Sequence, residues 1–145
     1  METLELLNDI AEQCGIPVVD VRISNDSVGA MSVCDDDGDC IIAIDSSKVK
    51  SVSDINVKFA HELGHCKTGS FYNKHSPFDV ISKHEYHADK WAVQKLVPYN
   101  DFISACKRGC TEVWELADYF DVTEDFIRRA YEIYSNMGYD FESEV

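Results

Sequence analysis

The feature of this sequence that most constrains its fold is the pentapeptide HELGH at residues 61–65. His61 and His65 stand four residues apart, and on a helix that spacing leaves two side chains about 40 degrees apart around the axis. Both imidazoles can therefore bind one metal ion. Glu62 lies about 100 degrees from His61, beside the two ligands but poorly aimed at the same ion. A carboxylate in that position suits a general base that acts on water.

A helix is predicted around this motif, from Ser53 to about Thr68. Ser53 is a candidate N-cap, and Asp54 in the first turn would interact favourably with the helix dipole. The apolar residues of the segment lie at roughly 120 to 200 degrees from His61 around the axis; they are Ile55, Phe59, Leu63 and Cys66. The helix would therefore pack through one face and present its histidines on the opposite face.

A catalytic zinc usually has three protein ligands, so a third ligand is expected outside HELGH. The segment SKHEYHADKWAVQKLVP, residues 82–98, predicts a second helix that begins at Ser82 or Lys83 and stops at Pro98. Four donor side chains lie on this segment, namely His84, Glu85, His87 and Asp89. The third ligand is expected among them.

Helical geometry ranks these four donors. Glu85 and Asp89 share a face with the apolar Ala92, whereas His87 falls on the opposite, polar side. His84, about 100 degrees from Glu85, stays a weaker candidate. We predict that Glu85 binds zinc and that Asp89 accepts a hydrogen bond from the second ring nitrogen of a ligand histidine. The alternative for Asp89 is a solvated charge on the helix surface.

The remaining sequence predicts an α+β fold in a single domain over residues 1–145. Apolar residues recur at helical spacing up to Cys14, so a helix is expected to open the chain. Three β-prone runs follow, VVDVRI, GAMSVC and CIIAID, and predict a small three-stranded antiparallel sheet. Short helices are expected to end the chain, with N-caps at Asn100 or Asp101, at Thr111 and at Thr123.

Acidic residues outnumber basic residues about two to one, with 27 Asp plus Glu against 13 Lys plus Arg. Such a surface repels a phosphate backbone, so no direct contact with nucleic acid is expected. The segment LADYFDVTEDFIRR faintly resembles a helix-turn-helix, but its acidic residues favour core-packing helices. The opening METLELLNDI lacks the segments of a secretory signal, and no stretch reaches membrane-spanning length. We therefore expect a cytoplasmic protein without membrane contact, whose six cysteines are free thiols.

The two donor segments together resemble a known family. AHELGH followed by HEYHADKWAVQKLVP is similar to the ImmA/IrrE metallo-endopeptidases, above all to short members from phages and mobile elements. The resemblance implies a minimal zincin-like fold in which His61, His65 and Glu85 bind zinc and Glu62 is the catalytic base. Two departures bear on substrate preference: HCKTGSFYN replaces a more apolar run, and His87 stands where an acidic residue is common.

A peptidase of this kind also needs a hydrogen-bond donor for the oxyanion that develops on the substrate. Three residues lie within reach along the chain, namely Tyr72, His75 and Tyr86, and the sequence does not choose among them. For each of them, core packing or solvent exposure is the alternative. We predict these three as possible oxyanion or substrate contacts.

The resemblance implies a protein substrate, often a helix-turn-helix repressor of the same mobile element. The substrate is expected to add as a strand to a sheet edge formed by GAMSVC or CIIAID. The alternative is a non-cleaving, zinc-containing regulatory protein that binds a repressor. Glu62 favours the peptidase, because a structural zinc site needs no general base and closes with four ligands. A chance motif on a metal-free helical domain is disfavoured by the two-part match.

Overall fold

The computed structural model describes residues 2–24, 28–73 and 75–141. Its elements in chain order are α1 (Thr3–Gln13), β1 (Val18–Asp20), β2 (Ala30–Cys34), β3 (Cys40–Ile44), the short 3-10 helix η1 (Ser46–Lys48), α2 (Val52–Thr68), α3 (Phe78–Leu96), α4 (Tyr99–Lys107), α5 (Val113–Phe120) and α6 (Glu124–Asn136). The α+β class expected from the sequence is confirmed, and the helices and strands follow one another in the expected order.

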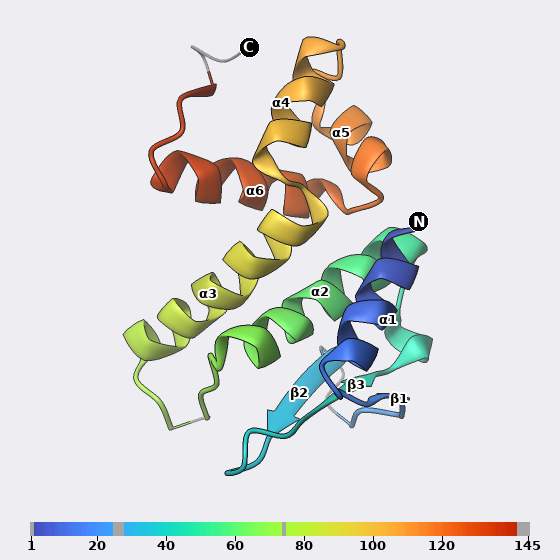
Figure 1. Cartoon of the computed structure of the whole chain (residues 1–145), viewed down its shortest axis with the longest axis vertical. Helices are drawn as coiled ribbons and strands as arrows, with labels where there is room; N and C mark the ends of the chain where they lie inside the picture. Colours follow the sequence, from blue (N-terminus) through green and yellow to red (C-terminus); the bar gives the residue numbers. More distant parts are fainter. Residues whose placement is uncertain (1, 25–27, 74, 142–145) are drawn as a thin grey trace.

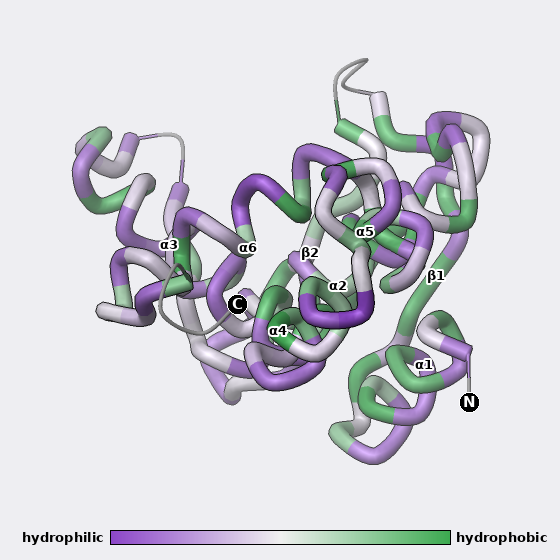
Figure 2. The backbone as a smooth tube through the Cα atoms, turned by 90° about the horizontal axis from the view of Figure 1, so that it is seen from above, coloured by the Kyte–Doolittle hydropathy of each residue, from purple (hydrophilic) through white to green (hydrophobic). Residues whose placement is uncertain are grey.

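Helix α2 runs through the middle of the molecule (Figure 1). Helix α1 and the sheet lie on one side of it, α3 packs on the other, and α4 to α6 gather at one end, where α6 crosses α3. The apolar face of α2 is buried as the sequence predicted, with Phe59 and Leu63 almost fully inaccessible. Hydrophobic and hydrophilic residues alternate along α1 (Figure 2). Its buried residues are Leu7 and Ala11, one turn apart, so α1 packs through one face.

The sheet has the strand order β1-β3-β2 and is mixed. Strands β2 and β3 form the expected antiparallel hairpin, with Ser32 opposite Ile42. Strand β1 runs parallel to β3, with Val19 opposite Ala43, so the sheet differs from the wholly antiparallel one expected. Strand β3 lies between β1 and β2, so the two strands that follow each other in the chain do not pair, and strand order depends on contacts that the local pattern does not contain.

Two helices begin earlier than predicted, and each follows a proline. Helix α3 begins at Phe78 instead of Ser82 or Lys83, and α4 begins at Tyr99 with Pro98 at the N-cap, where Asn100 or Asp101 was expected. The carbonyl of Pro77 accepts the first hydrogen bond of α3, and the carbonyl of Pro98 does the same for α4. Our prediction treated Pro98 only as a helix stop and did not consider Pro77 as the residue before a helix, although the fixed φ of proline also suits that position.

The N-caps elsewhere follow ordinary capping chemistry. Helix α2 is capped by Ser51 instead of Ser53, because the Ser51 hydroxyl accepts a hydrogen bond from the Asp54 amide at 3.0 Å. Helix α5 begins after Glu112 instead of Thr111. Thr123 caps α6 as predicted. These shifts leave the faces of the helices unchanged.

Helices α2 and α3 approach each other closely at Gly64, the glycine of HELGH. A Cβ atom built on Gly64 would lie 2.4 Å from the carbonyl oxygen of Ala88, and Ala88 itself is fully buried. Such a distance is far inside van der Waals contact, so only glycine fits at this crossing. The close approach brings α3, and with it Glu85, alongside the histidines of α2.

The C-terminal helices share the core with α2 and α3. Tyr134 of α6 is buried, and its hydroxyl donates to the carbonyl of Val97 at 2.7 Å. Buried side chains from both ends of the chain form one cluster, which includes Leu7, Ile42, Phe59, Val93, Phe126 and Ile133. Among the described residues, no helix is long and apolar enough to cross a membrane. The six cysteines are free thiols, and Cys34 lies opposite Cys40 across the hairpin.

Candidate metal centre

Three side chains from two helices converge at one point beside α2. The Nε2 atoms of His61 and His65 lie 3.1 Å apart. Glu85 of α3 brings its Oε2 to 2.8 Å from His61 Nε2 and its Oε1 to 3.3 Å from His65 Nε2. The ligand atoms of all three residues lie within 4.8 Å of one another. The i, i+4 spacing places both rings on one face of α2, and the close crossing at Gly64 supplies the carboxylate.

The second ring nitrogen of each histidine is occupied by an acceptor. Nδ1 of His61 lies 2.7 Å from Oδ1 of Asp89, one helical turn after Glu85 on α3. Nδ1 of His65 contacts the carbonyl oxygen of Ser70 in the turn that follows α2. An acceptor at Nδ1 keeps the proton there and leaves the Nε2 lone pair directed into the site. Both rings therefore direct Nε2 to the place where a metal ion could bind.

The electrostatics of the site favour a cation. Burial by itself lowers the pKa of His61, but hydrogen bonds to Asp89 and Glu85 outweigh burial and raise that pKa to about 10. Burial by itself raises the pKa of Glu85, but hydrogen bonds from His61, His65 and Tyr72 hold that pKa well below its usual range. A positive charge is thus stabilised between two carboxylates, and a metal ion would compete with a proton for that place.

The donor set fits a divalent transition metal. Two imidazole nitrogens and one carboxylate are the protein ligands of many catalytic zinc sites, in which a fourth position stays open. Carboxylate oxygens alone would favour magnesium or calcium, whereas imidazole favours zinc and its neighbours. His61, His65 and Glu85 would hold the ion. Asp89 and the Ser70 carbonyl would support the two rings.

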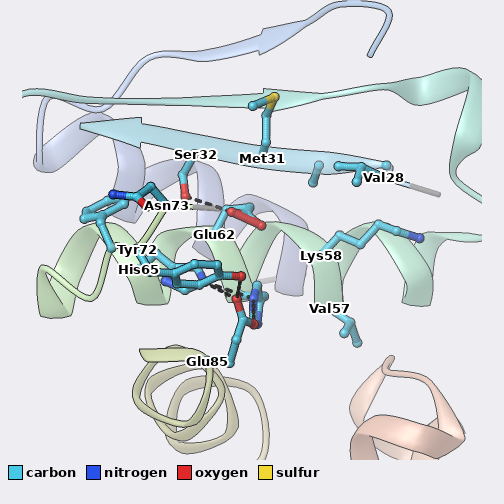
Figure 3. A pocket seen from close by; sticks show the side chains of 14 residues that line it. Val28, Met31, Ser32, Val57, Lys58, Glu62, His65, Tyr72, Asn73 and Glu85 are labelled. Carbon is cyan, nitrogen blue, oxygen red and sulfur yellow. Dashed lines mark hydrogen bonds and ion pairs between the residues drawn. The ribbon is translucent and has the colours of Figure 1, made fainter. Parts of the chain in front are cut away.

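Glu62 lies beside these ligands and outside their group. Its side chain is only 8% exposed, and its Oε1 accepts a hydrogen bond from the Ser32 hydroxyl of β2 at 2.7 Å. Figure 3 shows Glu62 between Ser32 and the cluster of His65 and Glu85. The strand thus positions the carboxylate that the helix supplies. A group held in this way can transfer a proton without leaving its position.

A pocket of about 790 Å³ opens over the cluster. One wall is β2 with the residues before it, the floor is α2, and the far end is the segment that follows α2 (Figure 3). The lining residues are Val28 to Ser32, Val57, Lys58, His61, Glu62, His65, Phe71, Tyr72, Asn73 and Glu85. All three candidate ligands and Glu62 therefore face one open cavity.

The three residues considered as oxyanion donors fall in different places. The Tyr72 hydroxyl donates to Glu85 at the pocket wall. His75 is exposed and does not line the pocket. The ring of Tyr86 lies under the guanidinium of Arg129, 5.4 Å from it, on the side of α3 that faces α6. Only Tyr72 is within the cavity.

The two other histidines of α3 lie outside the cluster. His84 stacks on Tyr72, with ring centroids 6.4 Å apart, and among the described residues its Nδ1 has no hydrogen-bond partner. His87 is exposed, on the polar side of the helix where the pattern placed it. The group of possible ligand residues in the described chain contains neither of them.

Three supporting contacts were missed by the sequence reasoning. They are the hydroxyl of Ser32, the carbonyl of Ser70 and the side chain of Arg129, which donates to Asp89 from α6. The alternation in GAMSVC does place Ser32 on the inner face of its strand, so the direction of its side chain could have been predicted from the sequence. No sequence signal indicates the other two, since one is a backbone atom and the other depends on how α6 packs.

The chain belongs to the IrrE N-terminal-like domain family (Peptidase_M78), whose model matches residues 11–132. This match confirms the resemblance seen in the sequence and makes the protein a member of a metallopeptidase family. The α+β fold is compatible with a minimal zincin-like domain. No curated protein and no solved structure gives a significant match to the chain. The matched range contains the two histidines, Glu62 and Glu85.

Proposed function

We propose that this protein is a zinc-dependent endopeptidase that cleaves a protein at a specific site. The observation that carries the proposal is the convergence of His61, His65 and Glu85 at the floor of an open pocket, with Glu62 beside them. Three ligands leave a position for water or substrate, and an adjacent carboxylate has a use only if a proton moves.

Bound zinc would supply Lewis acidity, which polarises a peptide carbonyl and acidifies water. Glu62 takes a proton from the attacking water and returns it to the leaving amine. Ser32 holds Glu62 in position through one carboxylate oxygen, which leaves the other oxygen for proton transfer. Asp89 and the Ser70 carbonyl keep the two imidazoles from turning while charge develops in the site.

Tyr72 is the residue we propose as the oxyanion donor. It is the only one of the three candidates in the pocket, and its hydroxyl already lies at the carboxylate of Glu85. That hydrogen bond to Glu85, together with burial, raises the pKa of Tyr72 to about 12, so the hydroxyl keeps its proton at neutral pH. A protonated phenol beside the site can donate to a developing negative charge.

The substrate would bind as an extended strand along β2. This strand is at the edge of the sheet, and the residues from Val28 to Ser32 form a wall of the pocket. Edge pairing presents a peptide carbonyl to the cluster and uses main-chain hydrogen bonds, so a flexible segment of a folded protein suffices as substrate. We propose a cytoplasmic helix-turn-helix repressor of a phage or mobile element, as the family resemblance implies.

The first test is metal content. Purified wild-type protein is expected to contain about one zinc per chain by mass spectrometry. Glu85→Ala is expected to lose most of it, since two imidazoles alone bind weakly. His84→Ala removes a neighbouring histidine outside the cluster and is expected to keep the metal. Wild-type protein that takes up no zinc after reconstitution would contradict the proposal.

The second test separates cleavage from binding. Purified helix-turn-helix repressors are incubated with wild-type protein and with Glu62→Gln, and products are identified by mass spectrometry. We expect cleavage at one position by the wild type, a loss of at least about 100-fold in Glu62→Gln, and unchanged zinc content in both. A repressor bound equally by both proteins and cut by neither would favour the non-cleaving regulatory protein.

A further inference from the structure

We propose that Arg129 of α6 is a positioning residue for the metal centre, and that it acts through Asp89 on the ligand His61. The inference rests on the metal site of the proposed function. Arg129 Nε donates to Asp89 Oδ2 at 3.0 Å, and His61 Nδ1 donates to Asp89 Oδ1 at 2.7 Å. The two oxygens of one carboxylate thus connect α6 to the ligand helix α2.

The geometry of a carboxylate explains why the outer contact matters. A carboxylate held at one oxygen can rotate, and its second oxygen then leaves the ring nitrogen that it accepts from. With the guanidinium at Oδ2, rotation breaks two charge-assisted hydrogen bonds instead of one. Arg129 therefore fixes the plane of Asp89, and Asp89 fixes the ring of His61 with Nε2 directed at the metal position.

The surroundings make these contacts stronger than surface ion pairs. The side chains of Arg129, Asp89 and His61 are 29%, 24% and 23% exposed, so water screens them only in part. The guanidinium also lies over the ring of Tyr86, and its Nη1 contacts Glu132 Oε1 at 3.1 Å. Arg129 is thus held from two further sides, and it presents Nε to Asp89 in a defined direction.

The neighbouring arginine shows what an ordinary surface position on α6 looks like. Arg128 is 59% exposed, and its ion pairs are with Glu124 and Asp125 of its own helix. It has the same side chain type and lies on the same helix as Arg129, but within the described part of the chain its ion pairs do not reach α3. Arg128→Met is therefore a matched control for Arg129→Met.

The experiment measures zinc affinity of the full chain by competition with a chromophoric chelator. Arg129→Met is expected to bind zinc about 10-fold to 100-fold more weakly than wild type, and Arg128→Met is expected to match wild type. Arg129→Lys keeps the charge but loses the planar Nε donor, so an intermediate loss is expected. In the cobalt-substituted protein, the visible absorption bands should change in Arg129→Met and not in Arg128→Met. Wild-type affinity in both Arg129 variants would overturn the proposal.

A double-mutant cycle tests the path through Asp89. If Arg129 acts through that carboxylate, Arg129→Met should weaken zinc binding by less than about 2-fold in an Asp89→Asn background. Full additivity would overturn the proposal, because Arg129 would then act on stability in general. The melting temperatures of the metal-free proteins identify such an effect, and Arg129→Lys carries the test if Arg129→Met does not fold.

The positioning role of Arg129 can be tested separately from the proposed peptidase activity. A wild-type protein that binds zinc, responds to Arg129→Met as expected and cuts no repressor would support the positioning role and contradict the peptidase. A wild-type protein that binds no zinc would overturn both. Cleavage assays are therefore not needed to judge the role of Arg129.

Discussion

His61 and His65 lie one turn apart on the same helix, but the acceptors that hold their Nδ1 atoms come from different parts of the chain. His65 donates to the carbonyl of Ser70, five residues further along the chain. His61 donates to Asp89, 28 residues away, which is itself held by Arg129 another 40 residues on. The first support forms with the turn that ends α2, whereas the second exists only when α3 and α6 have packed. One candidate ligand is therefore oriented by local structure and the other by tertiary structure.

The largest expected effect comes from breaking the tertiary support with Gly64→Ala. The new methyl group would overlap the carbonyl oxygen of Ala88, so α3 must move away from α2. We expect the free energy of unfolding to fall by about 1 to 3 kcal/mol, and zinc affinity to fall with it because Glu85 and Asp89 both move. Urea unfolding and zinc competition measure the two effects.

Gly29→Ala is the control for that substitution. Its added Cβ would meet only the end of the Lys58 side chain, at 2.9 Å, and a flexible chain can move. Equal stability and zinc affinity of Gly64→Ala and wild type would show that the helix crossing does not position the ligands.

A smaller effect is expected from breaking the local support with Gly69→Ala. Gly69 ends α2 with φ +66°, and no atom beyond its chain neighbours lies within 4 Å of a Cβ built there. The effect is therefore one of backbone conformation, about 1 kcal/mol of unfolding free energy, with a few-fold loss of zinc affinity as the Ser70 carbonyl shifts. Gly69→Asn, which tolerates this conformation better, should lie nearer to wild type. Equal losses in the two variants would contradict this account.

The difference between local and tertiary support also explains how much of the site could be predicted from the sequence. The spacing in HELGH is a property of one helix, and it was sufficient to predict that both imidazoles face one point. Helical periodicity was likewise sufficient to place Glu85 and Asp89 on one face of α3, where both reach His61. Arg129 was not predictable, since its role depends on how α6 crosses α3. Its neighbour Arg128 has the same sequence surroundings and none of these contacts.

For the fold as well, the sequence predicted local features better than contacts between distant segments. The positions of the helices and strands follow from periodicity and turn residues, and the family match confirms the overall expectation. The pairing of β1 with β3 was missed, because strand order depends on contacts between residues far apart in the sequence. The early starts of α3 and α4 were missed for a local reason: Pro98 was considered only as a helix stop, and Pro77 was not considered as the residue before a helix.

The last expected effect depends on pH and concerns Asp45, whose carboxylate accepts hydrogen bonds both from its own turn and from a distant segment. It is 1% exposed and accepts from Ser47, two residues on, and from the amide of Ile23, 22 residues before. The hydrogen bond from the Ser47 hydroxyl, then that from Ile23, lowers the pKa of Asp45 to about 2. Because the folded pKa is lowered, this stabilisation is complete above about pH 4 and is lost as the pH falls towards 2.

Asp45→Asn removes this part of the pH dependence. The difference in unfolding free energy between wild type and Asp45→Asn should therefore be largest near pH 6 and shrink below pH 4. Urea unfolding of both proteins at pH 6, 4 and 3 measures it. The exposed Asp36→Asn is the control, and a difference that stays constant with pH would contradict the prediction.

The open edge of β2 also has a consequence for the behaviour of the protein in concentrated solution. An edge strand with free main-chain groups can pair with the edge strand of a second molecule, which is a route to aggregation. The turn that follows β2 carries Asp35, Asp36, Asp37 and Asp39, and the whole chain has a formal net charge of −14. This net charge makes two copies repel as they approach edge to edge. Colloidal stability of this protein should therefore fall as salt is added, because ions screen the charge that keeps the edges apart.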